Sequence, residues 1–255
     1  MTELITLEGG CQVADTSRLA LNQHDGFLWK RVVGQIEGTK KLSLYYFEIN
    51  ETCREAIKFG DSESVLFLVS GAADIEIGGR PFKAQSGCGI HIRAGEAFLI
   101  RSICNEVVKI TVTVCPALDE FSTLPTSGDN FDARFPDRII DGEAQSKQSS
   151  GDRFYRLLVG PHNGSENVTQ FIGMVPASKA PEHYHLYEET IYILSGHGRM
   201  WSGESSTAVA AGSVIFLPRR QVHCLECTDP DGMLLMGSFY PAGSPAINYE
   251  TAEIQ

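Results

Sequence analysis

Long apolar runs and an excess of basic charge are both missing from this sequence. No stretch reaches the roughly 18 apolar residues that a membrane-spanning helix needs, so no membrane span is expected. The chain has 32 acidic and 21 basic residues and a formal net charge of -11. Because such a chain repels phosphate backbones, nucleic acid is not expected as a partner.

The N-terminus and the cysteines indicate a compartment. The first residues have neither the basic start nor the apolar core of a signal peptide. The seven cysteines are odd in number and scattered along the chain, which is not the pattern of a disulfide framework. We therefore expect free thiols in a reducing, cytoplasmic environment.

Signals for helices are also scarce, and only a short piece near 134–140 has weak helical character. The sequence has many apolar runs of four to eight residues rich in Val, Ile, Leu, Phe and Tyr, which glycines separate. This pattern is typical of short strands and hairpins. It predicts an all-β fold, either a barrel or a sandwich.

The chain repeats itself at a distance of 125 residues. Residues 65–79 align with 190–204, and residues 87–98 align with 212–223, without a gap. We therefore predict two successive barrel domains. The predicted boundaries are 1–116 for the N-terminal domain, 117–152 for a connector rich in Asp, Ser, Gly and Pro, and 153–255 for the C-terminal domain.

The second copy contains a set of side chains that could hold a metal ion. His183, His185 and Glu189 form an H-x-H-x3-E array, and His223 follows in a separate apolar run. Residues two apart on a strand share a face, so His183 and His185 point the same way. Three imidazoles and a carboxylate suit a divalent transition metal, here manganese, iron, nickel or zinc, and ligand type alone does not choose among them. The alternative for the histidine pair is a surface pair or part of a polar core network.

These two stretches resemble the two motifs of the cupin superfamily. Gly196 completes the first motif, and Gly212 and Pro218 precede His223 as in the second. Arg220 and Cys227 stand where the second motif has Gly and Asn. The resemblance implies two tandem cupin barrels of the jelly-roll, or double-stranded β-helix, type. It also implies that the four ligand positions are intact.

The N-terminal copy keeps the strand pattern but not the ligands. The residues 125 positions before the four predicted ligands are Lys58, Gly60, Ser64 and Phe98. None of these makes a usable ligand set, and Phe98 favours packing over chemistry. We therefore expect a metal-free N-terminal barrel that serves as a structural or dimerisation half, or as a lid. His91 aligns with Phe216 and is interpreted as a lone strand histidine.

A metal-free first cupin followed by a metal-bearing second cupin is similar to the layout of ureidoglycine aminohydrolase. That family uses a Glu and two His in the first motif and a Gln in the second. Here the order is His183, His185, Glu189, and His223 stands at the position of the Gln. The resemblance therefore covers the layout and not the ligand set.

Three residues are predicted to contact a substrate, namely Gln170, Arg199 and Trp201. Gln170 and Phe171 lie on the strand before the ligands, and one of them must face inward. Arg199 and Trp201 share a face of a later strand and could line the mouth of the pocket. The alternative for these two is a solvated arginine and a core tryptophan.

Two functional hypotheses follow. The first is a bicupin metalloenzyme that acts on a small oxygen-rich metabolite, as a dioxygenase or as a non-oxidative isomerase, lyase or hydrolase. The second is a small-molecule-binding or structural cupin whose metal has no catalytic role. By analogy with other cupins, a homodimer is expected.

Overall fold

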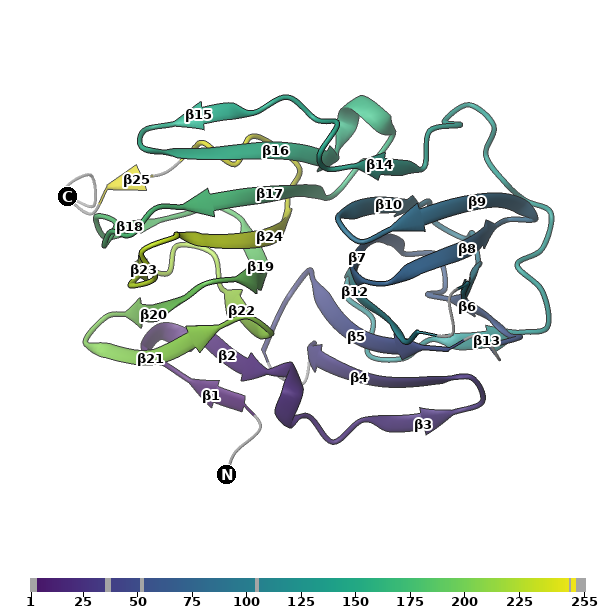
Figure 1. The fold of residues 1–255 in the computed structure, drawn as a ribbon, viewed down its shortest axis with the longest axis horizontal. Coiled ribbons are helices and arrows are strands. Elements are labelled where there is room, and N and C mark those ends of the chain that lie inside the picture. The colour runs from purple at the N-terminus through teal and green to yellow at the C-terminus, as the bar shows by residue number, and fades with distance from the viewer. Residues whose placement is uncertain (1–3, 35–37, 51–52, 104–105, 248, 251–255) are drawn as a thin grey trace. The chain divides into compact units, whose positions relative to one another are not determined.

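The computed structural model describes residues 4–34, 38–50, 53–103, 106–247 and 249–250 (Figure 1). Nearly all regular structure in these residues is antiparallel β-sheet, with 3-10 turns η1 (Glu8–Gly10), η2 (Thr16–Arg18) and η4 (Pro161–Asn163). The prediction of an all-β fold is confirmed. The weak helix near 134–140 is wrong, because Ile139–Asp141 pairs with a neighbouring strand.

The chain divides into two compact units. The N-terminal unit comprises residues 20–145 and 158–168. Its strands are β3 (Asn22–His24), β4 (Phe27–Val33), β5 (Ser43–Ile49), β6 (Ala56–Lys58), β7 (Glu63–Ser70), β8 (Ala72–Ile77), β9 (Arg80–Gln85), β10 (Cys88–Ile92), β11 (Phe98–Ser102), β12 (Val108–Cys115), β13 (Ser122–Leu124) and β14 (Ile139–Asp141). They form two sheets, in the orders β14-β10-β7-β12-β5-β4-β3 and β13-β6-β11-β8-β9.

The C-terminal unit comprises residues 1–19, 146–157 and 169–255. Its strands are β1 (Leu4–Thr6), β2 (Gln12–Asp15), β15 (Gln148–Ser150), β16 (Arg153–Val159), β17 (Thr169–Val175), β18 (His183–Tyr184), β19 (Glu188–Ser195), β20 (His197–Ser202), β21 (Ser205–Ala210), β22 (Ser213–Leu217), β23 (His223–Cys227), β24 (Met233–Tyr240) and β25 (Tyr249–Glu250). Its two sheets have the orders β1-β2-β22-β19-β24-β17-β16-β15 and β21-β20-β23-β18-β25.

The repeat seen in the sequence is a repeat of structure. Strands β7 to β12 recur as β19 to β24 with the same lengths, each displaced by 125 residues. The central orders β10-β7-β12-β5-β4 and β22-β19-β24-β17-β16 also correspond strand by strand. The two copies also share their burial pattern. The strands β7, β10, β19 and β22 are mostly buried, whereas β8 and β20 alternate between buried and more exposed residues.

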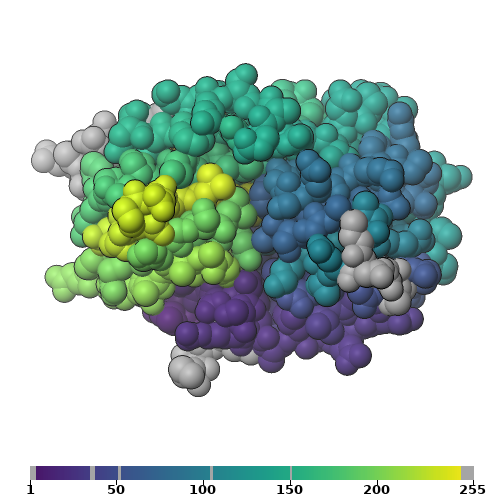
Figure 2. All heavy atoms as spheres, viewed as in Figure 1, coloured from purple at the N-terminus to yellow at the C-terminus, as the bar shows by residue number. Residues whose placement is uncertain are grey.

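The unit boundaries differ from the predicted domains at both edges. The strand β2 pairs with β22, with Val13 opposite Ile215, so residues 1–19 go with the C-terminal barrel and not with 20–116. In Figure 2 the purple atoms of this segment adjoin the green atoms of the C-terminal unit. In turn, β14 from the predicted connector pairs with β10 of the N-terminal barrel, with Ile140 opposite Gly89. Each barrel thus includes a strand from the part of the chain that precedes the other barrel.

The interior of the N-terminal barrel is packed with aromatic and aliphatic side chains. Phe98, at the position of His223, is 1% exposed, and its ring centroid lies 6.4 Å from that of Phe59. Phe121 adds edge-on and tilted contacts to Tyr45, Phe47 and Phe59. At the position of His223, this copy therefore has a packed aromatic side chain.

The described cysteines are all buried and none of them forms a disulfide; they are Cys11, Cys53, Cys88, Cys115, Cys224 and Cys227. Over the described ranges, no helix is long and apolar enough to cross a membrane.

Candidate metal centre

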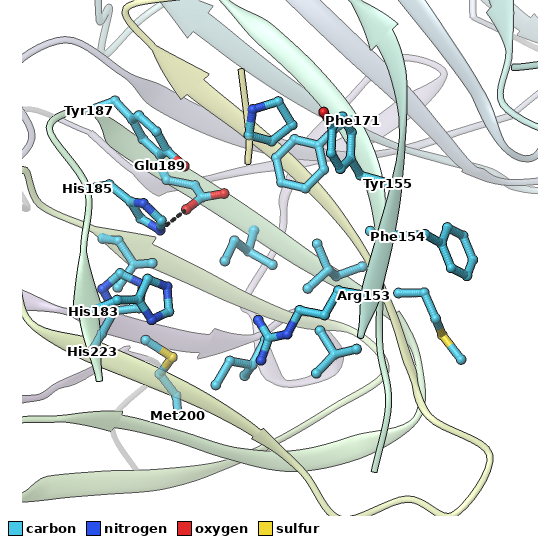
Figure 3. A pocket seen from close by; sticks show the side chains of 18 residues that line it. Arg153, Phe154, Tyr155, Phe171, His183, His185, Tyr187, Glu189, Met200 and His223 are labelled. Atoms are coloured by element: carbon cyan, nitrogen blue, oxygen red, sulfur yellow. Dashed lines mark ion pairs between the residues drawn. The ribbon is translucent and has the colours of Figure 1, made fainter. Parts of the chain in front are cut away.

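Three histidines of the C-terminal barrel converge at one end of its interior (Figure 3). His183 on β18 is paired directly with His223 on β23, and His185 follows immediately after β18. One nitrogen from each ring lies within 4.8 Å of those of the other two. The structure therefore brings together residues 40 positions apart that the sequence predicted to share a site.

Backbone carbonyls orient two of these rings. The Nδ1 of His183 lies 3.0 Å from the carbonyl oxygen of Pro181, and the Nδ1 of His223 lies 2.8 Å from that of Gln221. A carbonyl oxygen only accepts, so Nδ1 carries the proton and donates it. The Nε2 atom of each ring then keeps its lone pair, which is the state that a metal ligand requires.

Burial keeps the imidazoles neutral. It lowers the pKa of His185 to about 2 and that of His223 to about 3, and neighbouring histidines add to the effect. It also lowers the pKa of His183, which is less enclosed. At neutral pH all three rings can therefore offer a lone pair.

The predicted carboxylate ligand, Glu189 on β19, lies beside this cluster. Its Oε2 is 3.6 Å from the Nε2 of His185, and its side chain is 5% exposed. Burial raises the pKa of Glu189 to about 8. Because an ionised carboxylate in this position is destabilised without a cation, the residue fits a site that binds one.

Sequence reasoning missed Tyr187, which packs against the ligands. Its ring stacks on His185 at 4.4 Å between centroids and 9° between planes, and on Phe239 at 4.2 Å. The signal was present, because residues 183, 185, 187 and 189 have one parity and so share a face of an extended chain. Tyr187 thus holds the His185 ring in its orientation.

The histidines open onto a cavity of about 100 Å³ inside the barrel. That volume is several times the roughly 10–15 Å³ that one enclosed water requires. Most of the wall is apolar, and the side chains that form it away from the ligands include Phe171, Ile191, Met200, Leu217, Leu225 and Leu235. Arg153 enters the same cavity from β16, which sequence reasoning did not anticipate.

The residues predicted to contact substrate lie outside this cavity. Of the pair Gln170 and Phe171, it is Phe171 that lines the cavity, whereas Gln170 is buried on the other face of β17. On β20 the inward side chain is Met200, and its neighbours Arg199 and Trp201 face the opposite way.

Arg199 and Trp201 have partners on the outer face of their sheet. Arg199 donates to the Oγ of Ser206 at 2.9 Å, and the indole Nε1 of Trp201 donates to Glu226 at 2.7 Å. The Nζ of Lys179 lies 4.0 Å from the centroid of the Trp201 ring. The prediction that these two residues line the mouth of the pocket is corrected, because the side chain of β20 that faces the cavity is that of Met200, between them.

Comparison with known proteins agrees with this geometry. Residues 170–237 match the family model of the cupin domain, and this range contains the three histidines and Glu189. The chain as a whole has a bicupin-like fold, as the motifs implied.

Two solved structures illustrate the likeness. A single-residue mutant of Bacillus subtilis oxalate decarboxylase has a TM-score of 0.73 at 14% sequence identity, over 94% of this chain and 79% of that chain. Protein Ylba from E. coli has a TM-score of 0.70 at 13% identity, over 94% of each chain. At such identities the likeness defines the fold alone.

One curated protein also matches part of the sequence. A stretch of 117 residues is 26% identical to Frizzled-10 of Mus musculus, which is 45% of this chain and 20% of that protein. The chain therefore spans about a fifth of that protein's length, and the match carries no functional argument.

Proposed function

We propose that this chain is a metal-dependent bicupin enzyme with a single site in its C-terminal barrel, where His183, His185, His223 and Glu189 bind the ion. The observation that carries the proposal is the convergence of three neutral imidazoles at one end of a cavity. Its wall leaves room for a small substrate beside the ion.

The residues present fit a divalent transition metal. Two rings are held with Nδ1 on a carbonyl, which leaves Nε2 for the ion, and the buried Glu189 supplies one negative charge. When bound, such an ion would polarise a carbonyl or hydroxyl oxygen of the substrate, or support dioxygen chemistry. The donor set suits manganese, iron, nickel or zinc.

The reaction class is open between oxygenation and non-oxidative isomerisation, elimination or hydrolysis. A dioxygenase needs iron or another redox-active ion, whereas the other reactions need only a Lewis acid. The second candidate function is a small-molecule-binding cupin without turnover, which the largely apolar cavity wall favours over a purely structural role.

The other parts of the proposal concern assembly and setting. We propose a small molecule as the partner of the site, a homodimer as the assembly, and the cytoplasm as the compartment. The buried thiols support a reducing environment. Size-exclusion chromatography with light scattering would test the dimer.

Metal analysis by mass spectrometry on the untagged protein tests the proposal first. We expect about one ion per chain in the wild type and a loss of most of it in His185→Ala. The matched control is His197→Ala, a more exposed histidine of the same barrel that bonds to Asp229 and not to the cluster. Equal metal content in all three proteins, or none in the wild type, would contradict the proposal.

The identity of the bound ion then selects the activity assay. If the ion is iron, oxygen uptake is measured with 2-oxo acids, diketones and phenolic acids. If it is manganese, nickel or zinc, product formation is followed by NMR without oxygen. Metal-loaded protein that binds these compounds without turnover would favour the binding module.

A further inference from the structure

The cavity contains one cation whose charge no described residue neutralises. Arg153 extends from β16 into the cavity, and its guanidinium points toward His183 and His223 (Figure 3). Its Nη2 is buried and has no hydrogen-bond partner among the described residues. No ion pair joins Arg153 to a described carboxylate either, although Glu189 lines the same cavity.

A buried N–H of a guanidinium is costly unless an acceptor satisfies it. Arginine presents a planar fork of donors that matches a carboxylate bidentately. Other arginines of this chain show the usual arrangement. Arg138, for example, donates to both carboxylate oxygens of Glu96, and Arg134 pairs with Asp132. Arg153 instead faces a cavity with its Nη2 unsatisfied, a position from which it could donate to an acceptor group of a ligand.

The charge balance of the cavity also calls for an anion. A divalent ion with three neutral imidazoles and one carboxylate keeps one formal positive charge, and Arg153 adds a second. An anionic ligand between the ion and the guanidinium would interact favourably with both.

The apolar side chains of the cavity wall limit the chemistry of the part of the ligand that does not contact Arg153. Phe171, Ile191 and Leu235 are among the residues around the space between Arg153 and the ligands, and they offer no donors or acceptors in their side chains. A polyhydroxylated ligand would leave its hydroxyl groups unpaired there, which is unfavourable. A compact hydrocarbon body suits this wall and the volume of about 100 Å³.

We infer that the C-terminal cavity binds a small carboxylate with an apolar body, whose anionic group is held by Arg153. This inference rests on the proposed function, because it places the carboxylate beside the metal site. Arg153 is then the specificity-determining residue for charge, and the apolar wall selects against sugars.

Isothermal titration calorimetry of the full-length, metal-loaded protein tests the inference. The probes are 2-oxobutanoate, 3-methyl-2-oxobutanoate and benzoate, together with 2-oxobutanamide as a neutral isostere. We expect the wild type to bind at least one of the carboxylates. Arg153→Met should weaken this binding about 100-fold, because one partner of a buried charge pair is removed. Arg153→Lys should recover part of it, since the charge is kept and the fork is lost.

The controls separate the charge of Arg153 from general damage. Arg199→Met removes an arginine of the same barrel that lies outside the cavity, and should leave every affinity unchanged. Binding of 2-oxobutanamide should not respond to Arg153→Met. Equal carboxylate affinity in the wild type and Arg153→Met, or no binding of any carboxylate by the wild type, would overturn the inference.

Metal content measured on the same samples keeps the two proposals apart. A normal metal content with Arg153-independent binding overturns the carboxylate site and leaves the metal enzyme standing. An absent metal with Arg153-dependent binding overturns the metal enzyme and supports the carboxylate site.

Discussion

The two barrels share a strand plan and differ in what fills their interiors. At the position where the C-terminal barrel has His223, the N-terminal barrel has Phe98, and it has Lys58, Gly60 and Ser64 in place of the other predicted ligands. One interior is a close-packed aromatic core and the other encloses a cavity. A β-barrel of this size can therefore be held together by packing, or can give up part of its core for a polar site.

The two barrels also differ in the contacts that stabilise the turn before Phe98 and before His223. In the N-terminal barrel Glu96 accepts from the backbone of Arg93 and Asp132 and from the guanidinium of Arg138, which is 0% exposed. In the C-terminal barrel the equivalent residue is Gln221, which donates to Ser202 and to the carbonyl of Val222. A buried ion pair thus stabilises the turn in the N-terminal barrel, where the C-terminal barrel has the neutral hydrogen bonds of Gln221.

Truncation at the aligned position should have opposite consequences in the two barrels. Phe98→Ala leaves a cavity in a filled core, so we expect a loss of about 3–5 kcal/mol in the free energy of unfolding with normal metal content. His223→Ala should remove most of the bound metal, with a smaller effect on the unfolding of the metal-free protein. Denaturant titration and metal analysis on both variants make the comparison. Similar losses of metal in the two would contradict the assignment of the site to one barrel.

The buried pair of Arg138 and Glu96 should be the strongest polar contribution in the N-terminal barrel. Arg138→Met leaves Glu96 buried without its cation, so we expect a loss of about 3–5 kcal/mol by denaturant unfolding. Arg134→Met is the matched control, since this side chain is 77% exposed and its ion pair with Asp132 is screened by water, so stability should hardly change. Equal effects of the two substitutions would show that the buried pair is not required.

The same pair predicts a pH dependence. Burial alone would raise the pKa of Glu96, but hydrogen bonds from Arg138 and two backbone amides outweigh it and hold this pKa below its usual value of 4.5. A carboxyl whose pKa is lower in the folded state stabilises the fold above the unfolded pKa and loses this contribution as the pH falls through the folded pKa. The stability difference between the wild type and Glu96→Gln should therefore be constant above about pH 5 and shrink under more acidic conditions. A difference that grows with acid would contradict this assignment.

A smaller effect is expected at Gly237, which faces the cavity wall. The aligned N-terminal residue is the buried Val112, whereas a Cβ at Gly237 would collide with the ring of Phe171 and lie 3.1 Å from Oε1 of Glu189. Gly237→Ala should cost about 1–3 kcal/mol and displace Phe171 into the cavity. Gly243→Ala, whose Cβ would have its nearest neighbour at 3.9 Å, is the control for unfolding and for binding of 2-oxobutanoate. If Gly237→Ala and Gly243→Ala had the same stability and the same affinity for 2-oxobutanoate, the cavity wall would accommodate the added methyl group without cost.

The sequence by itself determined the all-β class, the repeat and the residues that meet at the histidine cluster. Six strands recur at the displacement of 125 residues that the alignment indicated, because alternation and glycine-marked turns are local properties of the chain. His183 and His185 could be assigned to one face because strand periodicity is two. The role of these residues as metal ligands stays a prediction.

Only the tertiary structure decided which strands close each sheet and which face of each strand is inside. The pairing of β2 with β22 and of β14 with β10 had no signal in the sequence, because the paired strands lie far apart along the chain. Parity grouped Arg199 with Trp201, but packing turned Met200 inward instead. Arg153 could be recognised only once β16 was placed against the histidines, because a shift of one residue exchanges the two faces of a strand.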